Sequence, residues 1–226
     1  MLTINHDKLT REVARHLEAD AVVAGMYWEQ TGNAVGGMGC FIGCLAHSDD
    51  ALVLEERFGL PLMLTKVCED IFEGLSHYDP ASGRDFFAAL PDAVGRDGKD
   101  LSRVVWQFLH VELRALPPQP ADYQALIEPV ISGMDLLASG EVWPAAAARA
   151  AADAVGPAAA YAAAHAAVYA AADGYADAAA CSAAYAVGYA ARSAAHAVAR
   201  KRQAQTILQL PTIHSAFEFA RKTRIN

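Results

Sequence analysis

Two cysteines and a histidine at helical spacing form the cluster of this sequence that could do chemistry. The stretch "GGMGCFIGCLAHSDD" covers residues 36–50 and places Cys40, Cys44 and His47 at positions i, i+4 and i+7. On a helix, side chains at this spacing project from one face. They could hold a metal ion, with Cys68 as a fourth ligand, or activate a thiol as a nucleophile with a neighbouring aspartate orienting the histidine.

The spacing supports neither reaction well. Structural zinc sites usually take cysteines two to four residues apart on a loop, with a second ligand pair that is not evident here. Two helical turns separate Cys40 from His47 by roughly 10 Å, too far for proton transfer, although Cys44 is only about one turn away. We therefore predict no catalytic residue, no metal ligand and no cofactor.

A small-molecule site is a third interpretation of the same stretch. The glycines of "GGMG" could offer backbone N–H groups to an anion, and an upstream Tyr-Trp pair could stack on a nucleotide-like ring. The stretch lacks the lysine of a phosphate-binding loop, and no strand is predicted before it. The residues that we predict to line such a site are Tyr27, Trp28, Gly37, Gly39, Cys40, Cys44 and His47.

A packing surface explains most of these residues equally well. Small side chains on one helical face would let another backbone approach closely, with the cysteines acting as small apolar groups. His47 would then lie at the helix C-terminus, where a histidine interacts favourably with the helix dipole. The alanine-rich part of the chain is an obvious partner for such a face. The sequence leaves the choice between packing and function open.

The elements that must position this stretch are predicted to be helical. Asn5 or Asp7 can cap an amphipathic first helix that runs toward Tyr27 and Trp28. Glycine and proline punctuation then predicts further helices, followed by a Pro-, Ser- and Gly-rich loop after Gly74. These helices cover 40–47, 51–59, 61–75, 85–91, 100–116 and a weak pair in 125–140. No stretch alternates cleanly over two paired strands, so we predict an all-α fold.

The last third of the chain is dominated by alanine. Between residues 145 and 199 the other residue types recur at steps of four, and glycines interrupt the pattern. We predict two or three helices there, packed as an alanine-rich layer, although a tolerated segment of high helix propensity would have the same composition. The domain prediction is a mixed-sequence helical body over 1–144 and an alanine-rich region with a basic end over 145–226, in one continuous fold.

Charge is distributed unevenly over the chain, whose net charge is −8. Residues 1–144 carry 22 acidic and 10 basic side chains, whereas the 31 residues from His196 onward carry six basic and one acidic. An acidic body disfavours binding of duplex nucleic acid, which needs a cationic surface. Direct nucleic-acid contact is expected only through the basic end, which could equally dock on the acidic body or on a second copy.

The location of the protein is predicted from its cysteines and its first residues. "MLTINHDKLT" is polar where a secretory leader would be apolar, so reduced thiols in the cytoplasm are expected. No window of about 18 residues is apolar and free of charge, so we predict no membrane span.

Residues 26–75 resemble a group of uncharacterised proteins encoded by bacteriophages and bacteria. The resemblance rests on a Tyr-Trp pair, a Gly-Cys-x-x-Gly-Cys-x-x-His run, a Gly-Leu-Pro turn and an acidic Phe-Glu-Gly-Leu helix. Many members of that group also end in alanine-rich arrays. The resemblance implies a phage or mobile-element setting and carries over no activity and no catalytic residue. The C-terminal "LPTIHSAFEFARKTRIN" does not match it.

These observations predict a non-enzymatic binding or inhibitory protein. Its expected target is a host protein or nucleoprotein, for instance one of a defence system, because an acidic protein can compete for the cationic surface of a nucleic-acid-binding partner. Alanine-lined faces would also allow a homo-oligomer. The alternative is a small-molecule (nucleotide-like) binding protein, or a thiol- or metal-dependent enzyme, that uses the Gly/Cys/His cluster.

Overall fold

The described part of the protein is a helical assembly with one small sheet, which confirms the predicted all-α class. The computed structural model describes residues 5–95, 101–116, 121–155 and 198–210, so most of the alanine-rich tract lies outside the described residues. The elements in chain order are α1 (His6–Glu18), β1 (Trp28–Gln30), β2 (Gly37–Gly39), α2 (Phe41–Ala46), α3 (Leu52–Phe58), α4 (Leu62–Tyr78), α5 (Pro80–Val94), α6 (Val104–Arg114), α7 (Ala121–Ser139) and α8 (Ala145–Val155). A further helix covers 198–210.

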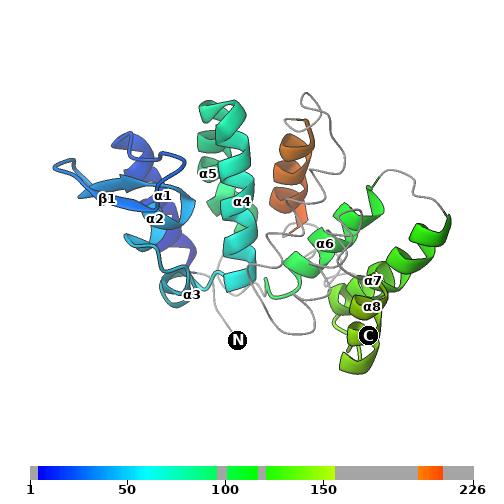
Figure 1. The fold of residues 1–226 in the computed structure, drawn as a ribbon. Helices are drawn as coiled ribbons and strands as arrows, with labels where there is room; N and C mark the ends of the chain where they lie inside the picture. The colour runs from blue at the N-terminus through cyan, green and yellow to red at the C-terminus, as the bar shows by residue number, and fades with distance from the viewer. Residues whose placement is uncertain (1–4, 96–100, 117–120, 156–197, 211–226) are drawn as a thin grey trace, which may run out of the picture.

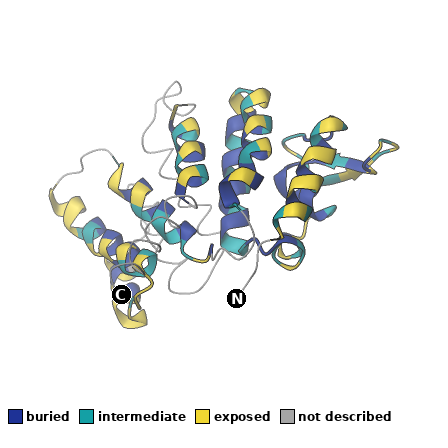
Figure 2. Cartoon of the chain, turned by 180° about the vertical axis from the view of Figure 1, so that it is seen from behind, coloured by how far each residue is buried: buried dark blue, intermediate teal, exposed yellow. Residues whose placement is uncertain are grey.

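The described elements are arranged in three groups along the molecule (Figure 1). The β-hairpin lies with α1, α2 and α3 at one end, α4 and α5 stand in the middle, and α6, α7 and α8 lie at the other end. The helix at 198–210 stands between α4 and α6. Figure 2 shows that exposed residues follow the outer sides of the helices, while buried residues face the neighbouring elements. No helix in the described part is long and apolar enough to cross a bilayer.

The first helix begins as predicted and ends earlier than predicted. The Asn5 side chain accepts a hydrogen bond from the Lys8 backbone N–H at 3.2 Å and so caps α1. The helix stops at Glu18, and Asp20 has a positive φ of 52°. After Asp20 the chain is extended and pairs with Gly39. Gly39 N–H donates to the Ala21 carbonyl, and Val23 N–H donates to the Gly39 carbonyl.

A short hairpin occupies the segment that the sequence predicted as turn alone. Strands β1 and β2 are antiparallel, with Trp28 opposite Gly39 and Gln30 opposite Gly37. Asn33 closes the connection, because its side-chain amide donates to the Gly37 carbonyl at 2.7 Å. Each strand has only three residues, so the alternation on which a strand prediction depends is too short to detect.

The second helix is buried on all sides. Every residue of α2, Phe41–Ala46, is buried, and Phe41 packs its ring against Phe72, Phe86 and Phe87 at centroid distances of 5.8–6.4 Å. Gly43 makes this burial sterically feasible, because a Cβ at this position would overlap the Tyr27 carbonyl oxygen. A Cβ on Gly39 would meet the same oxygen. In the described part of the chain, the backbone that approaches these glycines is therefore that of Tyr27.

The central helices are longer than the sequence predicted. Gly74 does not end α4, and a Cβ there would collide with the side chain of Arg200. Instead α4 continues to Tyr78, and α5 starts at Pro80, where Asp79 accepts a hydrogen bond from Ala81 N–H at 3.2 Å. The segment predicted as a loop after Gly74 is therefore the last turn of α4 followed by Asp79, the N-cap residue of α5. Likewise α7 is one helix with Pro129 inside it rather than a helix pair.

The helix at 198–210 docks on the acidic body. Arg200 forms an ion pair with Asp70, and Arg202 donates to the buried Glu112 carboxylate at 2.6 Å. Gln203 donates to the same Glu112 oxygen at 2.9 Å. This part of the basic end therefore makes the intramolecular contact that the charge distribution allowed. Its apolar residues join the hydrophobic core of residues 9–151.

The close contact of Gly43 with Tyr27 yields a stability prediction. We expect Gly43→Ala to lower the free energy of unfolding by about 2–3 kcal/mol, because the added methyl group must displace the Tyr27 backbone. Gly32→Ala is the matched control, since nothing lies within 4 Å of a Cβ built there. Urea unfolding followed by circular dichroism measures both, and equal stability of the two variants would contradict the packing role of Gly43.

Candidate functional site

The stretch that the sequence singled out is divided between two clusters of polar side chains. Cys40 precedes α2 as its N-cap residue, and His47 follows α2 in a left-handed conformation with φ 58°. Regular helical spacing therefore does not apply to either end, and the two side chains do not meet. Cys40 lies close to Glu69 and Glu73, whereas His47 lies close to Glu12 and His16.

Cys44 belongs to neither cluster. Its side chain is buried, and its sulfur donates to the carbonyl oxygens of Gly39 at 3.1 Å and Ala21 at 3.4 Å. Burial raises the pKa of this thiol to about 12, so it stays protonated at neutral pH. The thiol acts as a packing group that ties α2 to the chain before β1, and it is unsuited to nucleophilic attack.

The aromatic pair is also divided. The Trp28 ring stacks on His47 at a centroid distance of 4.8 Å and an interplanar angle of 12°. Gly37 leaves room for Trp28, because a Cβ at this position would collide with the indole ring. Tyr27 remains 52% exposed. Tyr27 is therefore available to a ligand, while the described structure already provides a stacking partner for Trp28.

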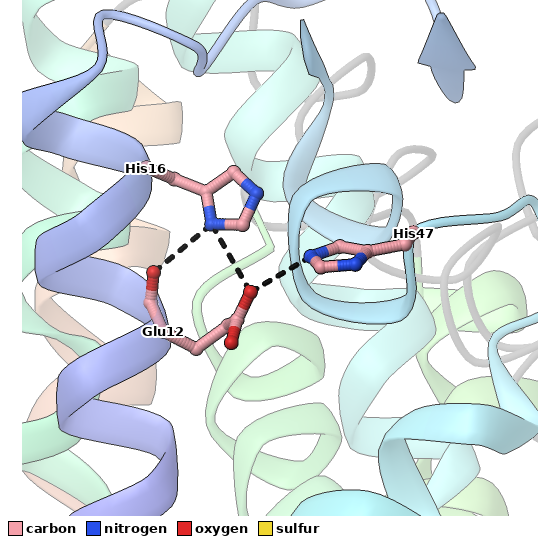
Figure 3. Close-up of side chains that lie close together, drawn as sticks. All are labelled: Glu12, His16 and His47. Atoms are coloured by element: carbon pink, nitrogen blue, oxygen red, sulfur yellow. Dashed lines mark hydrogen bonds and ion pairs between the residues drawn. The ribbon is translucent and has the colours of Figure 1, made fainter. Parts of the chain in front are cut away.

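Glu12 is the centre of the first cluster, which we call the Glu12 cluster and which consists of Glu12, Arg15, His16, His47 and Arg57. His47 Nε2 lies 2.7 Å from Glu12 Oε1, and His16 Nδ1 lies 3.4 Å from the same oxygen. Figure 3 shows that Glu12 and His16 come from one face of α1 and His47 reaches them from the end of α2. The Glu12 side chain is only 11% exposed, so these contacts form in a poorly solvated environment.

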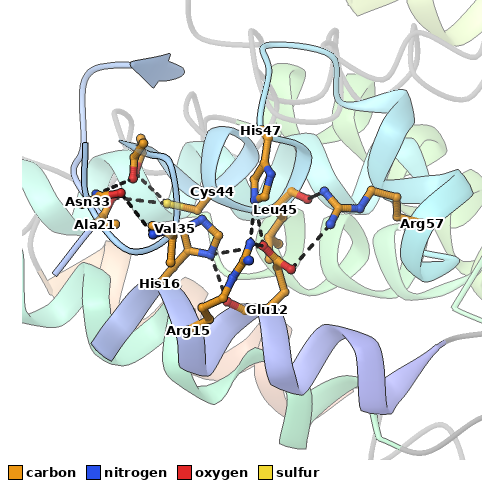
Figure 4. Close-up of polar contacts among 12 residues, drawn as sticks. Glu12, Arg15, His16, Ala21, Asn33, Val35, Cys44, Leu45, His47 and Arg57 are labelled. Atoms are coloured by element: carbon orange, nitrogen blue, oxygen red, sulfur yellow. Dashed lines mark hydrogen bonds and ion pairs between the residues drawn. The ribbon is translucent and has the colours of Figure 1, made fainter. Parts of the chain in front are cut away.

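Two arginines supply positive charge to Glu12 (Figure 4). Arg15 Nη2 lies 2.6 Å from Glu12 Oε1, and Arg57 Nη2 lies 3.5 Å from Glu12 Oε2. Burial alone would raise the pKa of Glu12, but the hydrogen bonds from Arg15 and His47 outweigh burial and lower it. The carboxylate is therefore ionised and paired with cations from its own chain.

His16 is held neutral in this cluster. Its side chain is fully buried, and its Nδ1 lies 3.0 Å from the Glu12 backbone carbonyl oxygen. Burial lowers the pKa of this imidazole, since the charged form would be poorly solvated. Two histidines and a carboxylate are a common ligand set for metals, but two guanidinium groups already neutralise Glu12. We interpret the Glu12 cluster as the contact that fixes α1 on the end of α2.

The second cluster lines a pocket of about 380 Å³ between α4 and the chain around β1. We call it the acidic pocket, and its lining consists of Gly25, Met26, Tyr27, Cys40, Lys66, Glu69, Asp70 and Glu73. Within it, ligand atoms of Cys40, Glu69 and Glu73 all lie within 4.8 Å of one another. A thiol and two carboxylates thus share one small space.

Backbone N–H groups orient both carboxylates. Glu69 Oε2 accepts a hydrogen bond from Ile42 N–H at 2.8 Å, and both Glu73 oxygens accept from Gly25 N–H at 2.9 Å. Burial nevertheless raises the pKa of Glu69 to about 7, and burial also raises the pKa of Glu73. In contrast to Glu12, these carboxylates are partly buried side by side without enough positive charge to keep them readily ionised.

Sequence reasoning missed most of the residues in both clusters. It singled out Cys40 and His47 but none of the carboxylates around them, and it did not include His16. One signal was present: Glu12 with His16, and Glu69 with Glu73, are each spaced by four residues and so share a helix face. The sequence did not indicate that the chain before β1 and the two ends of α2 pack against these residues.

Comparison with protein-family models, with curated proteins and with solved structures found no match for this chain. The predicted phage or mobile-element setting therefore stays a prediction.

The Glu12 cluster predicts a stability effect of one oxygen-to-nitrogen change. We expect Glu12→Gln to lower the free energy of unfolding at pH 7 by about 1–3 kcal/mol, because Arg15 and His47 lose a charged acceptor. Glu18→Gln, at the exposed end of the same helix, is the control and should change stability by less than about 0.5 kcal/mol. Chemical denaturation measures both variants. If Glu12→Gln leaves the free energy of unfolding unchanged, the cluster does not hold α1 in place.

The acidic pocket predicts a specific pH dependence. Because the folded-state pKa of Glu69 is about 7 and its ordinary value is 4.5, the folded state binds the extra proton between these values. This contribution therefore stabilises the fold as the pH falls from about 7 to 4.5. Relative to the unmodified chain, Glu69→Gln should raise the free energy of unfolding by roughly 1–3 kcal/mol at pH 8 and change it little at pH 4.5.

The exposed-carboxylate control for this test is Glu56→Gln on α3. The difference in free energy of unfolding between Glu56→Gln and the unmodified chain should be the same at pH 8 and pH 4.5. Urea unfolding at both pH values decides the outcome, and a Glu69→Gln difference that does not change with pH would show that Glu69 titrates normally.

Proposed function

We propose that the protein is a binding protein without turnover, and that its acidic pocket receives a cationic group from a partner. The observation that supports this proposal most directly is the pair of partly buried carboxylates, Glu69 and Glu73, in a pocket of about 380 Å³. A cation in the pocket would relieve the cost of placing their two negative charges close together. An arginine or lysine side chain is the cationic group that a protein partner would supply.

The charges around the pocket favour this ligand class. Asp70 is already paired with Arg200, so its charge is compensated within the chain. Lys66 also lines the pocket and lowers the pKa of Glu69, but its effect is smaller than the effect of burial. The negative charge of the pocket is therefore only partly compensated, so a cation would be attracted and a nucleotide phosphate would be repelled.

Tyr27 adds an aromatic wall to the pocket. Its side chain is half exposed, and it belongs to the pocket lining. A guanidinium group over a tyrosine ring contributes about 0.5–1 kcal/mol at an exposed site. Charge and an aromatic face together are the features that recognise an arginine side chain.

The absence of turnover in this proposal rests on the thiols. Burial raises the pKa of Cys40 above its ordinary value, and the nearby Glu69 charge raises it further. Burial also raises the pKa values of Cys44 and Cys68 to about 12. A nucleophilic cysteine needs the opposite electrostatic environment, so a thiol enzyme is the weaker alternative.

The setting of the proposal comes from the sequence. The resemblance of residues 26–75 to phage and bacterial proteins, with the excess of 22 acidic over 10 basic residues in 1–144, suggests a partner with a cationic surface. A host nucleic-acid-binding protein has such a surface, and occupying it would inhibit that protein. Self-association through the alanine-rich region, in the cytoplasm, is part of the same proposal.

Arginine binding tests the proposal. We expect N-acetyl-L-argininamide to bind the full chain with millimolar affinity in isothermal titration calorimetry, and Glu73→Gln to weaken binding at least about fivefold, since one attracting charge is lost. Tyr27→Ala should weaken binding by roughly two- to fivefold. Glu56→Gln, distant in sequence and exposed, should bind normally. N-acetyl-L-glutaminamide should not bind, and equal binding of both amides would contradict the proposal.

A further inference from the structure

The floor of the acidic pocket offers three metal-binding atoms to one point. We infer that Cys40 Sγ and the carboxylates of Glu69 and Glu73 bind a divalent ion that accepts both sulfur and oxygen ligands, of which Zn²⁺ is the typical example. The inference deepens the proposed function, because it rests on the pocket being a cation site and names a second cation for it. It concerns a ligand set that the sequence did not predict.

The geometry of the three donors fits such an ion. Their ligand atoms lie within 4.8 Å of one another, and zinc takes sulfur at about 2.3 Å and carboxylate oxygen at about 2.0–2.2 Å. In tetrahedral coordination two such ligands of one zinc ion lie roughly 3.3–3.7 Å apart, so side-chain rotations that bring the donors closer by about 1 Å would close the set. The donors come from different elements, since Cys40 is the N-cap of α2 and both glutamates lie on α4.

Surrounding backbone groups already hold the donors in place. The Gly25 N–H and the Ile42 N–H fix Glu73 and Glu69, which is the role that outer-shell hydrogen bonds play around metal ligands. Cys40 is only 1% exposed, and its sulfur lies 3.9 Å from the Tyr27 carbonyl oxygen. The same thiol hydrogen-bonds to the Glu69 carboxylate, so the proton between these two ligand atoms is the one that an ion would replace.

Charge distinguishes this cluster from the one around Glu12. Glu12, His16 and His47 also place ligand atoms within 4.8 Å of one another. There, however, Arg15 Nη2 is 2.6 Å from Glu12 and 3.3 Å from His47 Nε2, so a guanidinium takes the place of a metal ion. In the acidic pocket, Lys66 is the lining residue with a positive charge, and a divalent ion would balance the remaining charge of a thiolate and two carboxylates.

The inferred site has two chemical consequences. Metal binding must displace the Cys40 proton and any proton on Glu69, so affinity should rise with pH and protons should be released. Three protein ligands leave a coordination position open toward the pocket. The ion and an arginine side chain would share Glu69 and Glu73, so they should compete.

Cadmium titration of the reduced full chain tests the site, because Cd²⁺ replaces Zn²⁺ and its bond to a thiolate gives an ultraviolet charge-transfer absorption. We expect one Cd²⁺ per chain, a thiolate absorption that saturates at that ratio, and its loss in Cys40→Ser. Cys44→Ser is the matched control, since it removes a buried thiol of the same helix that lies outside the cluster, and it should retain the absorption.

Further variants keep the result decisive. Glu73→Gln should keep the thiolate absorption but weaken Cd²⁺ binding by roughly 10-fold or more, so this variant reports on the site even if Cys40→Ser fails to fold. His47→Ala should bind Cd²⁺ as the unmodified chain does, because His47 belongs to the other cluster. A loss of binding in His47→Ala, or no absorption with the unmodified chain, would overturn the inference.

The competition experiment separates this inference from the proposed function. If N-acetyl-L-argininamide binds and Cd²⁺ gives no thiolate absorption, the metal site is wrong and the cation pocket stands. If Cd²⁺ binds through Cys40 and the amide does not bind, the pocket is a metal site and the proposed capture of a cationic side chain is wrong. If both bind, added Cd²⁺ should raise the apparent Kd of the amide.

Discussion

The close approach of the Tyr27 backbone to the start of α2 is the constraint on which the rest of this structure depends. Gly39 and Gly43 lack the Cβ atoms that would collide with the Tyr27 carbonyl oxygen. Without these two Cβ atoms, the chain before the hairpin can lie directly on α2. On one side, Trp28 then stacks on His47; on the other, Gly25 and Tyr27 close the pocket over Glu69 and Glu73.

The two polar clusters beside this contact are similar in composition and opposite in electrostatics. In both, a largely or partly buried carboxylate lies four residues from a second polar group on one helix. Glu12 receives two guanidinium groups from its own chain, and its pKa falls. Glu69 accepts a hydrogen bond from the Ile42 backbone N–H, and Lys66 compensates its negative charge only weakly. Burial therefore raises its pKa to about 7. The complete ion pairs around Glu12 hold α1 in place. The incomplete compensation of the Glu69 charge would instead leave this carboxylate able to accept a cation.

The sequence was sufficient for elements whose signals are local. Asn5, one of the two predicted cap residues, Gly59 at a predicted helix end and Pro61 at a predicted helix start each act within one helical turn, and the structure places helix ends at all three. The prediction failed where a distant residue decided the outcome. Gly74 has the appearance of a helix end, but it leaves room for Arg200, which is more than a hundred residues away.

The same distinction explains the candidate site. The sequence identified Cys40 and His47 because they lie close together in the chain, and it grouped them for that reason. Their partners, Glu69 and Glu12, are 29 and 35 positions away. Neither glutamate was predicted as a site residue, because burial of a carboxylate depends on which backbone covers it. For Glu69 that backbone is the first turn of α2, where Ile42 N–H donates to the carboxylate, and the sequence does not indicate this contact.

Burial and charge together define what can happen at Cys40. A thiol beside two carboxylates is held in its protonated form, so on its own it is less reactive than a free cysteine. A cation at the same point would reverse this, because it favours the thiolate and both carboxylates at once. The protonation of all three groups would therefore respond to any cation that enters the pocket.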